Sequence, residues 1–328
     1  MKIQTSNQKF NQLENLPSNP SDILIFMTKI NVVCGGQSSE REVSLRSGNA
    51  VANALRQIGY DVRVLDTSDN DETMANCEVV FPVLHGIGGE DGEFQARLEK
   101  LGVTFVGTDA TGSKLCMDKS AYRAFMIERG FLMPQGVTVD ETSYFSHSLS
   151  RQAHVLKPVD GGSSVDTYIF RDPNLRDEEK LRDSFARNNE MILEELITGT
   201  EVTVGILGNK PLPVIEIIPP AEGEFDFENK YNGLTQELTP PPHVTSELQL
   251  KVQNTALEAH IAAGCRDFSR SDFIVTDKGD CYLLETNTIP GMTDQSLFPK
   301  AAAIAGFPMP KLVDKLVGFA LARCEHNT

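Results

Sequence analysis

The chain has 328 residues, with 30 basic and 46 acidic side chains and a formal net charge of −16. Hydrophobic residues make up 40% of the chain, which is typical of a globular protein with two or three domains. So negative a charge argues against general binding to nucleic acid or to anionic membranes, because both are polyanions, but it does not exclude a local basic pocket.

Residues 1–28 are rich in Asn, Gln, Ser and Pro, and we interpret them as a disordered leader. Neither they nor any later segment contains an apolar run long enough for a secretion signal or a membrane span. The six cysteines are scattered without the spacing of a zinc site. Such spacing favours reduced thiols, so we expect a cytoplasmic protein without a membrane partner.

Residues 29–107 alternate expected strands with expected helices. The strands are expected at 30–34, 61–65, 79–84 and 104–106, and a helix at 94–101. Another helix is expected to begin at a capping box formed by Ser39 and Glu42 and to stop at Gly59. This order predicts an α/β domain with a mainly parallel sheet. Glycine loops follow its strands, where open α/β sheets bind ligands.

The remainder predicts a two-module α+β fold, divided at about residues 108–195 and 196–324. The first module has expected helices at 119–129 and 174–188 and strands at 153–157, 165–170 and 191–196. The second has strands at 201–207 and 212–218, a helix at 246–265, a hairpin and two closing helices. Within the second module, between the strand at 212–218 and the helix at 246–265, residues 219–243 form a long segment without periodicity. Loops of this length are usually functional or disordered.

The hairpin carries the most informative chemistry. A tight turn at 277–280 would pair Asp272 with Glu285 and Arg270 with Asn287, all on one face of the sheet. Two carboxylates opposite each other repel, and a divalent cation would remove the conflict. Oxygen ligands alone favour Mg²⁺ or Mn²⁺ over Zn²⁺. The alternative is an exposed edge hairpin with incidental charges.

Two glycine-rich loops could surround a phosphorylated ligand. Lys157 precedes Gly161-Gly162-Ser163-Ser164, whose backbone N–H groups could wrap phosphate oxygens, although a plain hairpin turn would look much the same. The other loop spans 85–92 and begins with His85 at the end of an expected strand. No G-x-G-x-x-G follows the first strand, which argues against a dinucleotide-binding dehydrogenase.

Several of these motifs together resemble those of the D-alanine–D-alanine ligases, ATP-grasp enzymes of bacterial cell-wall synthesis. The resemblance runs from about residue 29 to residue 322 and rests on residues 35–44, 85–92, 117–119, 157–158, 162–165 and 285–293. It implies an ATP-grasp fold, D-alanine and ATP as substrates, and commonly a homodimer. ATP would phosphorylate the carboxylate of a first D-alanine, and the amine of a second D-alanine would then attack the acyl phosphate.

The resemblance also implies roles for residues around the substrates. Glu40 would hold the first ammonium and join Ser163 and Tyr231 in a hydrogen-bonded set, with His85 nearby. Arg270 and the N–H of Gly291 would stabilise the oxyanion. Ser296 and Leu297 would bind the carboxylate end of the second D-alanine.

For ATP and metal, the resemblance implies contacts by Lys119, Lys157, Ser164 and Lys230 on the phosphate side, by Glu194, Ile197 and Glu201 on the adenosine side, and two magnesium or manganese ions on Asp272, Glu285 and Asn287. Residues 219–243 would form a closing loop that excludes water.

Departures from the family pattern leave alternatives open. Asp166 would either repel ATP or point to solvent, Glu195 replaces a frequent lysine, and Phe225 and Phe227 replace frequent tyrosines. One alternative is therefore a degenerate nucleotide-binding homologue without activity. Another is a ligase whose second substrate is D-lactate or D-serine, although Tyr231 favours an amine.

Overall fold

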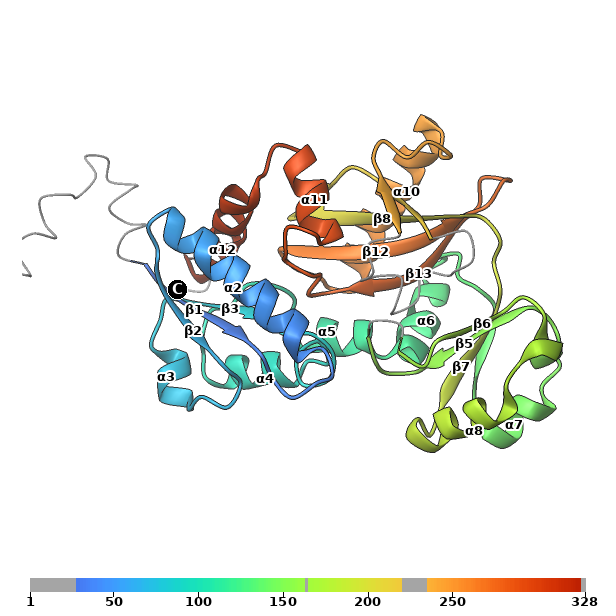
Figure 1. Cartoon of the computed structure of the whole chain (residues 1–328). Coiled ribbons are helices and arrows are strands. Elements are labelled where there is room, and N and C mark those ends of the chain that lie inside the picture. Colours follow the sequence, from blue (N-terminus) through green and yellow to red (C-terminus); the bar gives the residue numbers. More distant parts are fainter. Residues whose placement is uncertain (1–27, 163–164, 220–234, 326–328) are drawn as a thin grey trace, which may run out of the picture.

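The structure is a computed structural model that describes residues 28–162, 165–219 and 235–325, and these ranges contain three sheets. The first is parallel, in the order β2–β1–β3, as the sequence predicts. Its strands are β1 (Lys29–Cys34), β2 (Asp61–Leu65) and β3 (Val79–Val83). Ile30 and Val32 pack toward α2 (Arg41–Gln57), whereas Val33, the residue after Val32, packs toward α3 (Asp71–Ala75) and α4 (Glu93–Lys100). This alternation places helices on both faces of the sheet (Figure 1).

Two details of this domain differ from expectation. The predicted capping box is wrong: α2 begins at Arg41 after Glu40, and no side chain caps it. Ser38 instead accepts from the Glu40 N–H, which leaves the Glu40 side chain to line a cavity. The expected strand at 104–106 is only a single parallel bridge between Phe105 and Val80.

Two helices lead from this domain to a four-stranded sheet. They are α5 (Ala110–Met117) and α6 (Lys119–Glu128). The sheet is antiparallel, in the order β4 (Gly136–Val139), β7 (Met191–Glu195), β5 (His154–Pro158) and β6 (Tyr168–Phe170). Its core is buried beneath α7 (Glu141–Ser146) and α8 (Glu178–Arg187), which flank the short 3₁₀ helices η1 (Leu149–Arg151) and η2 (Pro173–Leu175).

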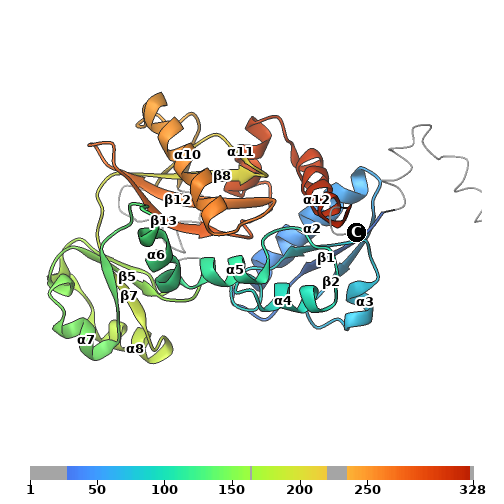
Figure 2. The same ribbon diagram turned by 180° about the vertical axis from the view of Figure 1, so that it is seen from behind.

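The third sheet has six strands, with the path β11–β10–β8–β12–β13 and β9 paired to β8. They are β8 (Thr200–Leu207), β9 (Lys210–Pro211), β10 (Ile215–Ile218), β11 (Gln236–Leu238), β12 (Phe268–Val275) and β13 (Cys281–Asn287). On one face, α10 (Ser246–Ala262) packs over β8 and β12. The chain then returns through α11 (Leu297–Ile304) to α12 (Met309–Glu325), which lies along α2 of the first domain (Figure 2).

The α2–α12 packing is one buried cluster that joins the first and third sheets. It combines residues of β1, α2 and β3 with Leu297 and Phe298 of α11 and Leu312 and Val313 of α12. Because this cluster is apolar and fully buried, it fixes the position of α2 relative to the third sheet. No helix in the described ranges is long and apolar enough to cross a membrane.

The β12–β13 hairpin has the predicted strand pairs at the end away from its turn, but the turn differs from the predicted one. Asp272 pairs with Glu285 and Arg270 with Asn287, as predicted. Nearer the turn, however, Phe273 pairs with Leu283, so the register shifts by one residue. The loop holds three residues rather than two, with Gly279 at φ 81° and the Thr276 N–H bonded to the Asp280 carbonyl. A β-bulge between the Phe273 and Asp272 pairs restores the predicted pairs.

Candidate active site

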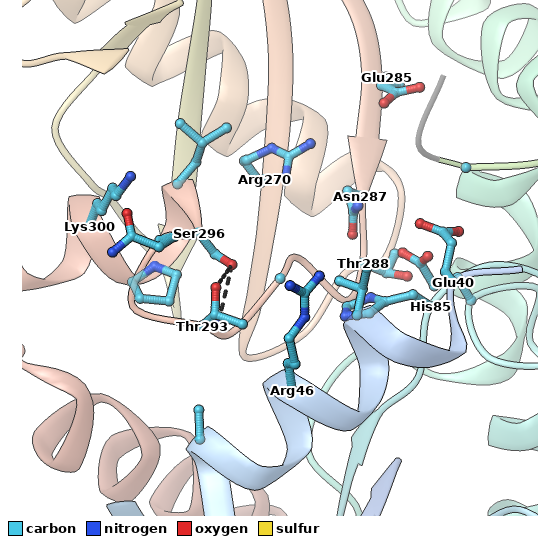
Figure 3. Close-up of a pocket in the computed structure, with 18 of the residues that line it drawn as sticks. Glu40, Arg46, His85, Arg270, Glu285, Asn287, Thr288, Thr293, Ser296 and Lys300 are labelled. Carbon is cyan, nitrogen blue, oxygen red and sulfur yellow. Dashed lines mark hydrogen bonds between the residues drawn. The ribbon is translucent and has the colours of Figure 1, made fainter. Parts of the chain in front are cut away.

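A cavity of about 1080 Å³ lies where the three sheets approach one another. Figure 3 shows side chains entering it from α2, β12, β13 and the segment before α11. Nine of the residues given a catalytic, substrate, ATP or metal role from the sequence line it: Glu40, His85, Lys119, Arg270, Glu285, Asn287, Gly291, Ser296 and Leu297. Residues more than 200 positions apart in the chain therefore meet at one place.

Arg270 and Asp272 form a bidentate ion pair on β12. Arg270 Nε lies 2.9 Å from Asp272 Oδ1, and Nη2 lies 2.8 Å from Oδ2. The Thr203 hydroxyl also donates to Asp272 Oδ1, at 2.5 Å. Burial disfavours the charged guanidinium, but Asp272 and then Glu285 outweigh burial and raise the pKa of Arg270. Arg270 is therefore a fixed cation at the cavity wall.

The predicted metal ligands fit a hard divalent cation in their donor chemistry. Glu285 and Asn287 are two residues apart on β13 and both line the cavity, while Asp272 lies beside Glu285 on the neighbouring strand. All their donors are oxygens, and carboxylate oxygens that accept from Arg270 and Thr203 retain lone pairs for a cation. The described residues contain no cluster of three His, Cys, Asp or Glu side chains suited to a metal. A cation would therefore need further oxygens from a ligand.

Two buried carboxyl groups, Glu40 and Glu90, share one corner of the cavity. Gly86 separates them: its N–H donates to Glu90 Oε2 at 2.8 Å, and a Cβ at this position would lie 2.8 Å from Glu40 Oε2. Gly162 also approaches Glu40 closely, since a Cβ at this position would lie 2.5 Å from the same Glu40 oxygen. A Cβ at either position would therefore require the Glu40 carboxylate to move, which explains glycine in each loop.

Two ionisable side chains in this corner, Glu90 and His85, have strongly shifted pKa values. Burial, and next the charge of Glu40, raise the pKa of Glu90 to about 8. Burial lowers the pKa of His85 to about 4, so its imidazole is neutral at pH 7. The His85 ring lies 3.5 Å from the Ser47 hydroxyl, which also accepts from the Met292 N–H. Sequence reasoning missed Glu90, although it falls within the glycine loop at 85–92.

On the proposed phosphate side, two lysines have different surroundings. Lys119 Nζ donates to the Gly161 carbonyl at 2.6 Å, and burial lowers its pKa despite the opposing field of Glu285. Lys157 instead pairs with Glu194, with Nζ and Oε2 2.8 Å apart and side chains only 12% and 6% exposed. Both partners of this pair were singled out as ATP contacts, and the structure connects them to each other.

The remaining predicted residues lie away from the cavity lining or outside the described ranges. Ile197 follows β7, and Glu201 is on β8 opposite Ile217 and Ile274. Ser163, Ser164, Lys230 and Tyr231 lie outside the described residues, as do Phe225 and Phe227.

Asp166 does not point to open solvent, one of the two expected alternatives. Its carboxylate accepts from Arg187 Nη2 at 2.7 Å and from Asn188 Nδ2 at 2.8 Å, on and just after α8. Burial of Asp166 is outweighed by the hydrogen bonds from Arg187 and Asn188, which lower its pKa. Because Arg187 neutralises this charge, repulsion of ATP is weakened. Glu195 accepts from the Gln135 N–H at the edge of the same sheet.

Family models and curated relatives match most of the chain. The model described as D-ala D-ala ligase C-terminus matches residues 141–318, and the one described as D-ala D-ala ligase N-terminus matches residues 63–108. A D-alanine–D-alanine ligase of Desulforudis audaxviator is 41% identical over 309 residues, which cover 90% of this chain and 99% of that protein. One from Actinobacillus succinogenes is 40% identical, covering 88% of this chain and 96% of that protein.

Solved structures agree with these matches. A D-alanine–D-alanine ligase from Bacillus anthracis superposes with a TM-score of 0.80 at 31% identity, covering 92% of this chain and all of that one. Its complex with ATP gives 0.78 at 29% identity, with the same coverage. The VanG D-Ala:D-Ser ligase from Enterococcus faecalis gives 0.75 at 28% identity, covering 89% of this chain and 99% of that one. The chain therefore belongs to the D-alanine–D-alanine ligase family, and its fold is the ATP-grasp fold of that family.

Proposed function

We propose that this chain uses ATP to join two D-alanine molecules into D-alanyl-D-alanine for peptidoglycan precursor synthesis. One observation carries the proposal: Glu40, Arg270, Glu285 and Ser296 line a single cavity, although they come from three separate parts of the chain. These side chains provide an anion for an ammonium, a cation for a carboxyl group, an oxygen ligand for a metal ion and a hydroxyl for a second substrate. The likeness to curated ligases over about 90% of the chain supports the same assignment.

The proposed reaction has two steps. In the first, a carboxylate oxygen of one D-alanine attacks the γ-phosphorus of ATP, ADP leaves, and an acyl phosphate forms. In the second, the amine of the other D-alanine attacks the acyl carbon, inorganic phosphate leaves with a proton lost from the amine, and the peptide bond remains. Glu40 would hold the ammonium of the first D-alanine throughout, with Ser163 and Tyr231 beside it.

Both steps concentrate negative charge near Arg270. Its guanidinium lines the cavity and is held in place by Asp272, so it needs no reorganisation when charge develops. The Gly291 N–H would be the second donor to the tetrahedral oxyanion. Neutral His85 would contact the first substrate without adding a positive charge near its ammonium. Ser296 and Leu297 would hold the second substrate.

ATP would bind between the third and four-stranded sheets, with its phosphates near Lys119, Lys157, Ser164 and Lys230 and its adenosine near Glu194, Ile197 and Glu201. Mg²⁺ or Mn²⁺, two ions per site, would be held by Asp272, Glu285 and Asn287. Such ions supply charge neutralisation to the transferring phosphoryl group.

Phosphate release under defined substrates tests the proposal. We expect release that requires ATP, Mg²⁺ and D-alanine, with L-alanine as the negative control. Rate measurements with D-serine or D-lactate beside D-alanine then identify the second substrate, and the likeness to VanG makes D-serine the relevant competitor. If a product containing D-serine or D-lactate formed faster than D-alanyl-D-alanine, the assignment of D-alanine as the second substrate would be wrong. No turnover with any pair of substrates would indicate a degenerate nucleotide-binding homologue.

We also propose a cytoplasmic homodimer, as the family resemblance implies. Light scattering of the purified chain would give a mass twice that of the 36.1 kDa chain. A monomer at micromolar concentration would contradict this.

A further inference from the structure

The cavity contains a cation on α2 that the reaction described above does not use. Val43, Arg46 and Ala50 lie on one face of α2, and all three line the cavity. Figure 3 shows the Arg46 side chain reaching from α2 into the cavity toward Thr293 and Thr288. Neither a hydrogen bond nor an ion pair joins Arg46 to any residue in the described part of the chain, including Asp294, an exposed carboxylate in the same lining.

The other cationic side chains of this lining are already engaged. Arg270 is bound to Asp272, Lys300 Nζ lies 2.7 Å from Glu237 Oε2, and Lys119 donates to the Gly161 carbonyl. Two other arginines of α2 also have partners: Arg41 pairs with Asp66, and Arg56 donates to the Val62 carbonyl. Among the cationic lining residues that the structure describes, Arg46 is therefore the one with neither a hydrogen bond nor an ion pair.

The second substrate has an anion that needs a partner. Its α-carboxylate takes no part in bond formation and remains charged from binding to product release. Arg270 cannot serve it, because Arg270 is already paired and faces the reacting carboxyl group in the proposed function. Ser296, assigned to this end of the substrate, offers a hydroxyl but no charge, and its Oγ lies 2.8 Å from Thr293 Oγ1.

We propose that Arg46 binds the α-carboxylate of the second amino acid and so selects acceptors that carry one; this inference rests on the proposed function. A guanidinium presents two parallel N–H donors to a carboxylate, which fixes its orientation as well as its charge. Neutralising that carboxylate also favours the free amine over the ammonium ion, and only the free amine can attack the acyl phosphate.

The test compares Arg46→Ala and Arg46→Lys with Arg56→Ala as a matched control. Arg56 is on the same helix and has the same charge, but it lies outside the cavity lining. Phosphate release against D-alanine concentration yields separate KM values for the first and second D-alanine. D-alaninamide, which lacks the carboxylate charge, is then offered as the acceptor at low D-alanine, and the dipeptide products are measured by mass spectrometry.

We expect Arg46→Ala to raise KM for the second D-alanine roughly ten- to a hundredfold, the range of a lost charge-assisted hydrogen bond. KM for the first D-alanine and for ATP should stay within about twofold, and the preference for D-alanine over D-alaninamide should fall by the same factor as KM rises. For Arg46→Lys, KM for the second D-alanine should lie between the values for the wild type and Arg46→Ala, because lysine keeps the positive charge but lacks the two parallel N–H donors of a guanidinium. Arg56→Ala should match the wild type.

Two results would overturn the inference while leaving the proposed function intact: an unchanged preference between the two acceptors in Arg46→Ala, or an equal rise in every KM, which indicates a structural role. A wild-type protein that makes no dipeptide would refute the proposed function itself, and this inference with it. Thermal melting of each variant shows that the fold is retained.

Discussion

The pair formed by Lys157 and Glu194 makes a strong prediction about stability. The side chains are 12% and 6% exposed, and their charged atoms lie 2.8 Å apart. At an effective dielectric constant of about 20, Coulomb's law gives about 6 kcal/mol for unit charges at this separation, much of which offsets the cost of removing them from water. Lys157→Met removes one charge and leaves Glu194 buried and unpaired. We expect a loss of about 3–5 kcal/mol in the free energy of unfolding.

Urea denaturation followed by circular dichroism measures this loss without requiring activity. The double variant Lys157→Met with Glu194→Leu is the matched control, because it removes the second charge and replaces the pair with apolar side chains. We expect it to recover most of the lost stability. A loss below about 1 kcal/mol in the single variant, the range of exposed pairs, would refute this reasoning.

Further predictions concern the active-site corner and the proposed metal site. Glu285→Gln should abolish ATP-dependent phosphate release with an unchanged melting temperature; unchanged turnover would contradict the metal assignment. Gly162→Ala should lower kcat/KM for the first D-alanine at least tenfold, because its Cβ would lie 2.5 Å from Glu40 Oε2, whereas Gly318→Ala has nothing within 4 Å and should be neutral. Burial and Glu40 raise the pKa of Glu90 to about 8, so the folded state keeps a proton that the unfolded state loses above about 4.5. This contribution makes the free energy of unfolding fall as pH rises from about 4.5 to about 8. In Glu90→Gln, urea denaturation across this pH range should show a smaller fall in the free energy of unfolding.

Local patterns in the sequence predicted much of the fold. Apolar runs predicted β1 and β3, which are buried on both faces as parallel strands usually are. The hairpin register was right at Asp272 and Glu285, but the underlying turn was wrong. A three-residue loop and a bulge shift the register in opposite directions, and a sequence pattern of period two detects neither.

The sequence could not predict pairings that depend on tertiary structure. Lys157 and Glu194 lie 37 residues apart, and only the β5–β7 pairing brings them together. Asp166 was recognised as unusual, but its neutralisation by Arg187 depends on the placement of α8. Arg46 was missed because an arginine on a helix normally faces solvent, and its position in the cavity requires α2 to be packed against α12. Motifs therefore identified the candidate site residues, and packing determines what each one contacts.

An isotope-transfer experiment tests the acyl phosphate route most directly. The wild-type protein is supplied with ATP, Mg²⁺ and D-alanine labelled with ¹⁸O in its carboxyl group, and the released phosphate is analysed by mass spectrometry. Because a carboxylate oxygen attacks the γ-phosphorus and leaves with it, we predict one labelled oxygen in each phosphate and equal amounts of phosphate and D-alanyl-D-alanine. Unlabelled phosphate released alongside dipeptide would contradict the account.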